Sequence, residues 1–311
     1  MRILLIFCVS FVLVACGDDR AERLQANIKT ADYLIENLGN DLDTQGIRNA
    51  IILQQYATLL SKSKPDLRPL LTQLSKDSTR DGPMYRALSK RLSTLKSQPD
   101  VLGGIDAQLH ESDTLVEASD PSLYNDALSD PINVIADMSD GKLARVNAIS
   151  QSQSLQANGA ESNGAGSQLV GNPNYGHWQT NNNGGSFWQW YAAYTLFSAI
   201  SPRQIGYDRW STRRDYSYYN DVGRNRYTSP QQMKSQDDLV QRTKKKFGNK
   251  GSFNSPYAKS KTGASSMSTA SKQAQRAPSF SSKSSYSKQK SSSSSFRNST
   301  STTSRGVRRG K

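Results

Sequence analysis

The sequence holds few of the residues that build reactive or cross-linked sites. Its 311 residues include two cysteines, Cys8 and Cys16, and two histidines, His110 and His177. Beyond Cys16 the chain can form no intramolecular disulfide and no zinc site with cysteine ligands. The histidines lie outside any metal-ligand spacing, and neither a G-x-S-x-G nucleophile turn nor a phosphate-cradling glycine loop occurs. These absences predict a protein that is not an enzyme and that binds no metal or other cofactor.

The apolar run at the N-terminus is too short to cross a membrane. It covers the twelve residues 3–14 and follows a positive charge at Arg2. As a helix, such a run rises only about 18 Å, whereas the hydrocarbon core of a bilayer is about 30 Å thick. The segment therefore predicts a secretory leader rather than a spanning helix.

The residues at the end of this run, Leu13-Val14-Ala15-Cys16, resemble the lipobox of bacterial lipoproteins. The resemblance implies that residues 1–15 are a cleaved signal peptide. It also implies that Cys16 carries diacylglycerol on its sulfur and an acyl chain such as palmitate on its new amino group. Two or more acyl chains hold a protein stably at a membrane, so the implied location is the cell membrane or the outer membrane, facing the periplasm or the surface. Gly17 in the second position favours the outer membrane; the alternative is an ordinary secretory signal with a chance cysteine.

Acidic and basic residues are separated along the chain, although the net charge is +14. Residues 97–141 contain ten acidic residues and no lysine or arginine, whereas residues 251–311 contain twelve lysines and arginines and no acid. Blocks of like charge usually form solvated faces or tails. For the acidic stretch we expect a solvated face. Two alternatives are a divalent-cation site, although 137–141 matches little of a calcium loop, and a docking site for the basic tail.

The fold class predicted from apolar periodicity is mainly α. Residues 16–149 are expected to form a small helical hairpin or bundle, because Leu24, Ile28, Ala31, Ile35 and Leu38 repeat at helical spacing before Gly39. Further helices are predicted up to Pro65, over 67–74, and from Pro83 to Leu95. Asp120-Pro121 and Asp130-Pro131 both resemble helix starts, with aspartate as the cap and proline in the first turn.

The middle of the chain changes composition twice. Residues 150–170 are rich in Gln, Ser, Asn and Gly and predict a flexible linker. Residues 171–230 then form an aromatic-rich module that contains all four tryptophans, and this block weakly resembles a region of uncharacterised Gram-negative lipoproteins. Read as a helix, residues 186–200 are apolar on nearly every side, so such a helix would be buried in the protein or in an interface.

The aromatic side chains of this module admit two interpretations. One is a small hydrophobic core whose hydroxyl and indole groups find partners. The other is an exposed platform that stacks on sugar rings or lies at a membrane interface. The candidate ligand or interface residues are Trp178, Phe187, Trp188, Trp190, Tyr191, Tyr194 and Trp210.

Residues 231–311 are expected to be a basic, serine-rich and largely disordered tail that follows a short amphipathic piece over 231–246. Such a tail suits an anionic partner, with each cation near an anionic membrane contributing at most about 1 kcal/mol. The candidate anion-binding residues are Lys244, Lys245, Lys246, Arg305, Arg308, Arg309 and Lys311. Nucleic acid is not an expected partner, because an exported lipoprotein rarely meets it.

The predicted function is that of an envelope lipoprotein that tethers an anionic envelope polymer or lipid surface through this tail. One alternative is a cell-wall glycan-binding or hydrolytic accessory protein that uses the aromatic module. A further alternative is a structural scaffold for a partner protein.

Overall fold

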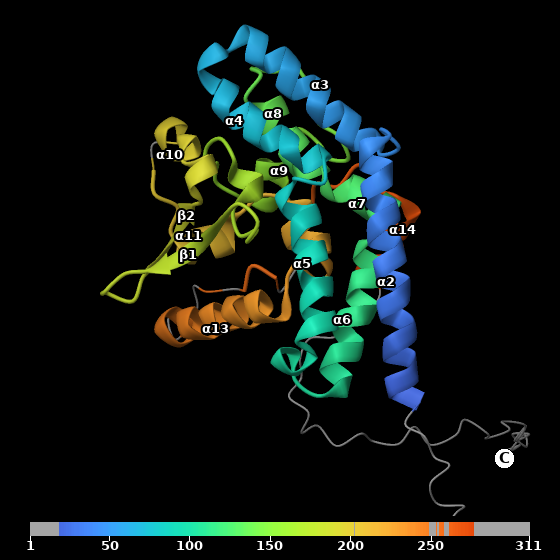
Figure 1. Cartoon of the computed structure of the whole chain (residues 1–311). Coiled ribbons are helices and arrows are strands. Elements are labelled where there is room, and N and C mark those ends of the chain that lie inside the picture. Colours follow the sequence, from blue (N-terminus) through green and yellow to red (C-terminus); the bar gives the residue numbers. More distant parts are fainter. Residues whose placement is uncertain (1–18, 202, 249–252, 254, 258–260, 277–311) are drawn as a thin grey trace, which may run out of the picture. The chain divides into compact units, whose positions relative to one another are not determined.

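The computed structural model describes residues 19–201, 203–248, 253, 255–257 and 261–276 (Figure 1). The mainly helical fold class is confirmed, with a single two-stranded sheet among the described residues. The described residues belong to one compact unit. The predicted signal peptide, Cys16 and the tail from residue 277 onward lie outside the described residues.

Three helices form an N-terminal bundle: α2 (Asp19–Asp43), α5 (Pro83–Ser97) and α6 (Ile105–Ala118) (Figure 1). Leu24, Ala31, Ile35 and Leu38 lie on the buried side of α2, as their spacing predicts. Gly39-Asn40, a sequence that can terminate a helix, does not end this one, because α2 continues to Asp43. Gly39 serves close packing instead: a Cβ there would come within 2.4 Å of the Arg80 guanidinium carbon.

A second group of helices consists of α3 (Arg48–Ser63), α4 (Arg68–Ser75), α7 (Pro121–Ala127) and α8 (Ser129–Asp137). The predicted cap at Asp120 is confirmed, because its carboxylate accepts hydrogen bonds from the Ser122 and Leu123 amides at 2.8 and 3.1 Å. The similar cap at Asp130 is wrong. Asp130 lies inside α8 and is buried, and its carboxylate accepts hydrogen bonds from residues 217–219.

The chain between 150 and 170 differs from the predicted flexible linker. It contains helix α9 (Gln151–Asn158), which Ser150 caps and which ends at Gly159 in the left-handed conformation. A 3-10 turn follows at Ser167–Leu169, and both Leu169 and Val170 are fully buried. Apolar burial in these few residues, together with local capping, orders a segment whose average composition is polar.

Residues 186–200 do not form the predicted continuous helix. β1 (Gly176–Thr180) and β2 (Ser186–Trp190) pair as an antiparallel hairpin, with Trp178 opposite Trp188. The Asn181–Gly185 connection closes it, and Gly184 supplies a positive φ of 72°. The short helix α10 (Leu196–Ile200) follows. A short apolar run fits a strand or a helix equally well, and here the cross-strand tryptophan pair and the turn decide the outcome.

The aromatic-rich module 171–230, called the aromatic segment below, also contains α11 (Tyr207–Arg213), a π-helical turn (Tyr219–Gly223) and α12 (Arg224–Tyr227). The predicted amphipathic piece corresponds to α13 (Pro230–Phe247), which opens with a complete capping box from Ser229 and Gln232.

Within the predicted tail, residues 255–257 and 261–276 form a strap that packs on the rest of the fold. The Gly263 carbonyl accepts a hydrogen bond from the Ile149 amide at 2.9 Å, and the Ser268 amide donates to the Asp126 carboxylate at 2.8 Å. Helix α14 (Thr269–Arg276) ends the described chain. The expectation of disorder is therefore wrong for residues 261–276, whose backbone hydrogen bonds go to distant residues.

Two ion pairs are buried where the segments meet. Arg91 of α5 pairs with Glu111 of α6 at 2.7 and 2.9 Å, and it also donates to the Arg226 carbonyl at 2.5 Å. Arg214 and Asp221 form a two-pronged pair at 2.6 and 2.9 Å, with side chains only 1% and 0% exposed. Arg214 also donates to the Pro256 carbonyl at 2.8 Å, so this pair fixes part of the strap to the aromatic segment.

We expect Arg214→Ala to lower the free energy of unfolding by about 3–5 kcal/mol, because it leaves the Asp221 carboxylate buried without its counter-charge. Urea unfolding followed by circular dichroism measures the change. Arg86→Ala, at an exposed position of α5, is the matched control and should change stability by less than about 0.5 kcal/mol. Equal effects of the two variants would contradict the role assigned to the buried pair.

Candidate functional site

The acidic stretch is only in part the expected solvated face, because four of its acids are exposed (Asp100, Asp106, Glu117 and Asp140) whereas Glu111, Asp126 and Asp130 are buried. Six of its ten acids lie within ion-pair distance of cations outside the stretch. These pairs are Asp106 with Arg20, Glu111 with Arg91, Asp113 with Arg23, Glu117 with Arg226, Asp137 with Arg145, and Asp140 with Lys64. Within the described residues, no group of three or more histidines, cysteines or acids could hold a metal ion. The buried Glu111–Arg91 pair therefore attaches α6 to α5, whereas the exposed pairs contribute little to stability.

The candidate cations divide between described and undescribed parts of the chain. Lys244, Lys245 and Lys246 lie exposed in the last turn of α13, where positive charge complements the helix dipole. The Lys246 ammonium donates to the Asn183 carbonyl at 2.7 Å and so contacts the hairpin turn. The remaining candidates, Arg305, Arg308, Arg309 and Lys311, lie outside the described residues, as does Cys16.

Most of the candidate aromatic side chains lie in the core. Trp188, Trp190, Tyr194 and Trp210 are 1–7% exposed, and Trp178 and Phe187 are partly buried. Their rings form a continuous set of contacts in which the Trp178 ring centroid lies 4.8–5.2 Å from those of Tyr207, Trp210 and Trp188. The hydrophobic-core interpretation thus holds for the burial of the tryptophans, but the indole N–H groups of Trp178 and Trp188 find no hydrogen-bond partner among the described residues. Of the seven candidates, Tyr191 alone is exposed, at 42%.

The outer face of the hairpin joins the candidates Phe187 and Tyr191 to three polar side chains that sequence reasoning missed, those of His177, Gln179 and Gln189. Because strand residues alternate between faces, Trp178, Trp188 and Trp190 point into the core. The opposite face carries His177, Gln179, Phe187 and Gln189, with His177 opposite Gln189 and Gln179 opposite Phe187. The His177 ring stacks on that of Tyr191 at a centroid distance of 5.7 Å. The signal in the sequence was the Asn- and Gly-rich turn 181–185 after the polar–apolar alternation of residues 177–179, whereas residues 186–190 alternate less regularly because Phe187 and Trp188 are adjacent.

Two buried carboxylates join the aromatic segment to the helices. Asp130 accepts hydrogen bonds from the Tyr218 and Tyr219 amides and from the Ser217 hydroxyl at 2.8–2.9 Å. Asp77 accepts from the Tyr175 hydroxyl at 2.9 Å. Burial raises the pKa of each carboxyl to about 7, although these hydrogen bonds oppose the rise. Both are almost fully excluded from solvent, so neither can reach a substrate, and their role is structural.

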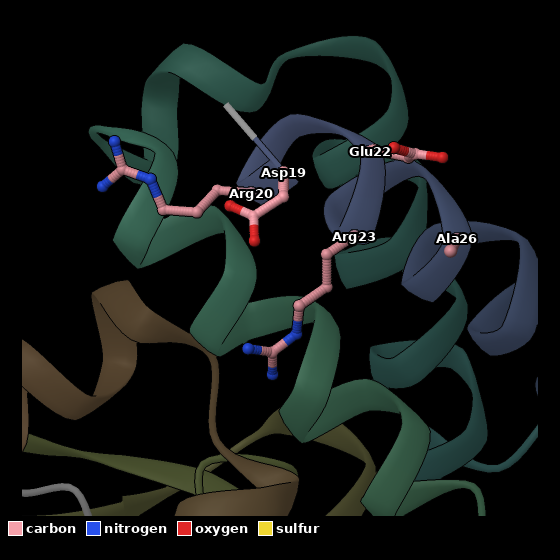
Figure 2. A pocket seen from close by; sticks show the side chains of 5 residues that line it. All are labelled: Asp19, Arg20, Glu22, Arg23 and Ala26. Carbon is pink, nitrogen blue, oxygen red and sulfur yellow. The ribbon is translucent and has the colours of Figure 1, made fainter. Parts of the chain in front are cut away.

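A surface hollow of about 380 Å³ lies at the start of α2, lined by Asp19, Arg20, Glu22, Arg23 and Ala26 (Figure 2). Figure 2 shows the guanidinium groups of Arg20 and Arg23 pointing in different directions. Each pairs with an acid of α6, Asp106 at 3.3 Å and Asp113 at 2.8 Å. The hollow therefore offers no convergent set of groups for a ligand.

A second hollow, of about 210 Å³, is lined by four residues of α11 together with two phenylalanines: Asp208, Arg209, Thr212, Arg213, Phe247 and Phe253. Both of its arginines form ion pairs with Glu161. Together with Asp208, this carboxylate offsets the positive charge, so the hollow is a poor anion site.

Comparison of the chain with protein-family models, with curated proteins and with solved structures found no match. Along the described part of the chain, no helix combines the length and the apolarity that crossing a membrane would need.

The Asp77 carboxyl should make stability fall as pH rises. Its native pKa of about 7 exceeds the unfolded value near 4, so the native state binds this proton more tightly. Its contribution to the free energy of unfolding is greatest below about pH 4 and decreases by up to about 4 kcal/mol as pH rises to about 7. Asp77→Asn should reduce this decrease in urea unfolding measured across that range. Asp81→Asn, at an exposed position, should leave the decrease intact, and an unchanged pH dependence in Asp77→Asn would refute the assignment.

Proposed function

We propose that this protein is an envelope lipoprotein that is anchored through Cys16 and acts as a tether rather than as an enzyme. The observation that carries the proposal is the Leu13-Val14-Ala15-Cys16 motif at the end of a short apolar run. Diacylglycerol on the Cys16 sulfur and an acyl chain on its amino group would provide stable membrane attachment, which a single chain does not.

The position of the first described helix supports a close attachment. Helix α2 begins at Asp19, three residues after Cys16, and three extended residues span at most about 11 Å. A lipidated Cys16 would therefore hold the start of α2 at the membrane surface. Arg20 lies 3.3 Å from Asp106, near the start of α6, so α6 would approach the membrane at the same end. The 25 residues of α2 then extend about 38 Å along the bundle.

The charge of the C-terminal residues supports an anionic partner. Residues 277–311 contain eight lysines and arginines and no acid, whereas many acids of the folded unit already pair with cations of that unit. We propose that these basic residues contact a lipid phosphate or an anionic envelope polymer. Each cation would contribute about 1 kcal/mol or less at an anionic surface, and salt would screen the attraction.

Expression of the full chain in a Gram-negative host tests the anchor. We expect the protein in the membrane fraction, with the mass of a chain that begins at Cys16 and carries diacylglycerol and a further acyl group. Cys16→Ser should abolish processing and acylation, because the thiol is the attachment point. A wild-type protein that is unacylated and retains residues 1–15 would show that the motif is not a lipobox in this chain.

Vesicle co-sedimentation tests the role of the basic residues. We expect a chain covering 17–311 to bind phosphatidylglycerol vesicles at low salt and to be released at high salt, because the attraction is electrostatic. A chain ending at Arg276 should lose most of this binding while keeping the strap that the fold requires. Replacement of the eight basic residues of 277–311 by glutamine is the length-matched control and should have the same effect. Retained binding in both variants would contradict the proposed tether.

A further inference from the structure

The outer face of the β1–β2 hairpin combines aromatic rings with amide side chains. In β1 it carries His177 and Gln179, and in β2 it carries Phe187 and Gln189 in direct cross-strand register. Tyr191 follows β2, and its amide donates to the Tyr175 carbonyl at 3.0 Å, which continues the ladder by one pair. The face is thus held by backbone pairing, and the opposite face is fixed in the core by Trp188 and Trp190.

Two of these rings form a stacked pair at the surface. The His177 and Tyr191 rings are stacked, with centroids 5.7 Å apart and planes inclined by 28°. Tyr191 is 42% exposed, and His177 and Gln189 are exposed beside it. This arrangement places ring faces next to hydrogen-bonding amide groups that are free to reorient at the surface.

The face lies in an uncharged part of the chain. Residues 162–202 contain no lysine, arginine, aspartate or glutamate, in a protein whose net charge is +14. Lys246 reaches the hairpin at Asn183 in the turn, which by register is the end remote from His177 and Tyr191. The residues of this face and their chain neighbours therefore supply no formal charge to hold an anionic polymer, and this matches a neutral ligand.

We infer that the face formed by His177, Gln179, Phe187, Gln189 and Tyr191 binds an uncharged polysaccharide. Equatorially substituted pyranose rings present C–H groups on their faces, which pack on aromatic rings, and hydroxyl or acetamide groups on their edges, which pair with amides. In this arrangement a sugar ring lies on the Tyr191–His177 pair, and Gln189 and Gln179 hydrogen-bond to the neighbouring edges. This binding is separate from the proposed tether, because it uses neither Cys16 nor the basic residues.

Isothermal titration of the chain covering 17–311 with neutral hexasaccharides tests the inference. The panel holds chito-, cello-, xylo-, manno- and malto-oligosaccharides. We expect saturable binding of at least one β-linked member, with a dissociation constant between about 10 μM and 1 mM. Tyr191→Ala should weaken this binding about tenfold because the stacking ring is removed. Gln189→Ala should weaken it about threefold through a lost hydrogen bond.

Two further variants separate the face from general effects on folding. Tyr191→Phe keeps the ring and should bind within about twofold of the wild-type chain. Tyr33→Ala removes a tyrosine of α2 that is even more exposed, at 66%, and should have no effect. Thermal unfolding verifies that each variant is folded. The inference is overturned if no member of the panel binds saturably, or if folded Tyr191→Ala binds as tightly as the wild-type chain. It is also overturned if Tyr191→Ala reduces vesicle binding but not sugar binding, because the face would then contact lipid.

Discussion

The carboxylate of Asp130 is the contact on which the rest of the structure depends. Asp130 lies in α8. Its carboxylate accepts hydrogen bonds from the Ser217 hydroxyl and from the Tyr218 and Tyr219 amides, which lie almost ninety residues further along the chain. These donors offset the desolvation of a carboxyl that is only 2% exposed. They also position the π-helical turn, whose Asn220 side chain donates to the Val170 carbonyl. Helices, aromatic segment and hairpin are thereby parts of one unit.

Charge separation along the sequence becomes charge pairing in the fold. Acids of α6 and α8 pair with cations of α2, of α5 and of the loop after α8, as in Glu111 with Arg91 and Asp113 with Arg23. Only the Glu111–Arg91 pair is buried, and it fixes α6 against α5. The Asp113–Arg23 pair is exposed and adds little stability. Six of the ten acids in residues 97–141 thus form ion pairs within the folded unit.

The sequence was a good guide to the helices and a poor one to their long-range partners. The apolar spacing from Leu24 to Leu38 and the Asp120-Pro121 start are local signals, and both correspond to the structure. Asp130-Pro131 looks the same locally, but its carboxylate is recruited by a distant segment. The hairpin was missed because an uncharged apolar run carries no clear period. The order in 261–276 was missed because it depends on acceptors and donors such as Asp126 and Asn147, which no local composition reveals.

Whether the aromatic segment and the helices unfold together tests this account most directly. All four tryptophans lie between 178 and 210, so tryptophan fluorescence reports on the aromatic segment, while far-ultraviolet circular dichroism reports mainly on the helices. For a chain covering 17–311, urea unfolding should give one transition with the same midpoint by both probes, because Asp130 joins the two parts. Two separate transitions would show that the aromatic segment is an independent module, and would contradict the single folded unit on which the proposed attachment and binding surfaces rest.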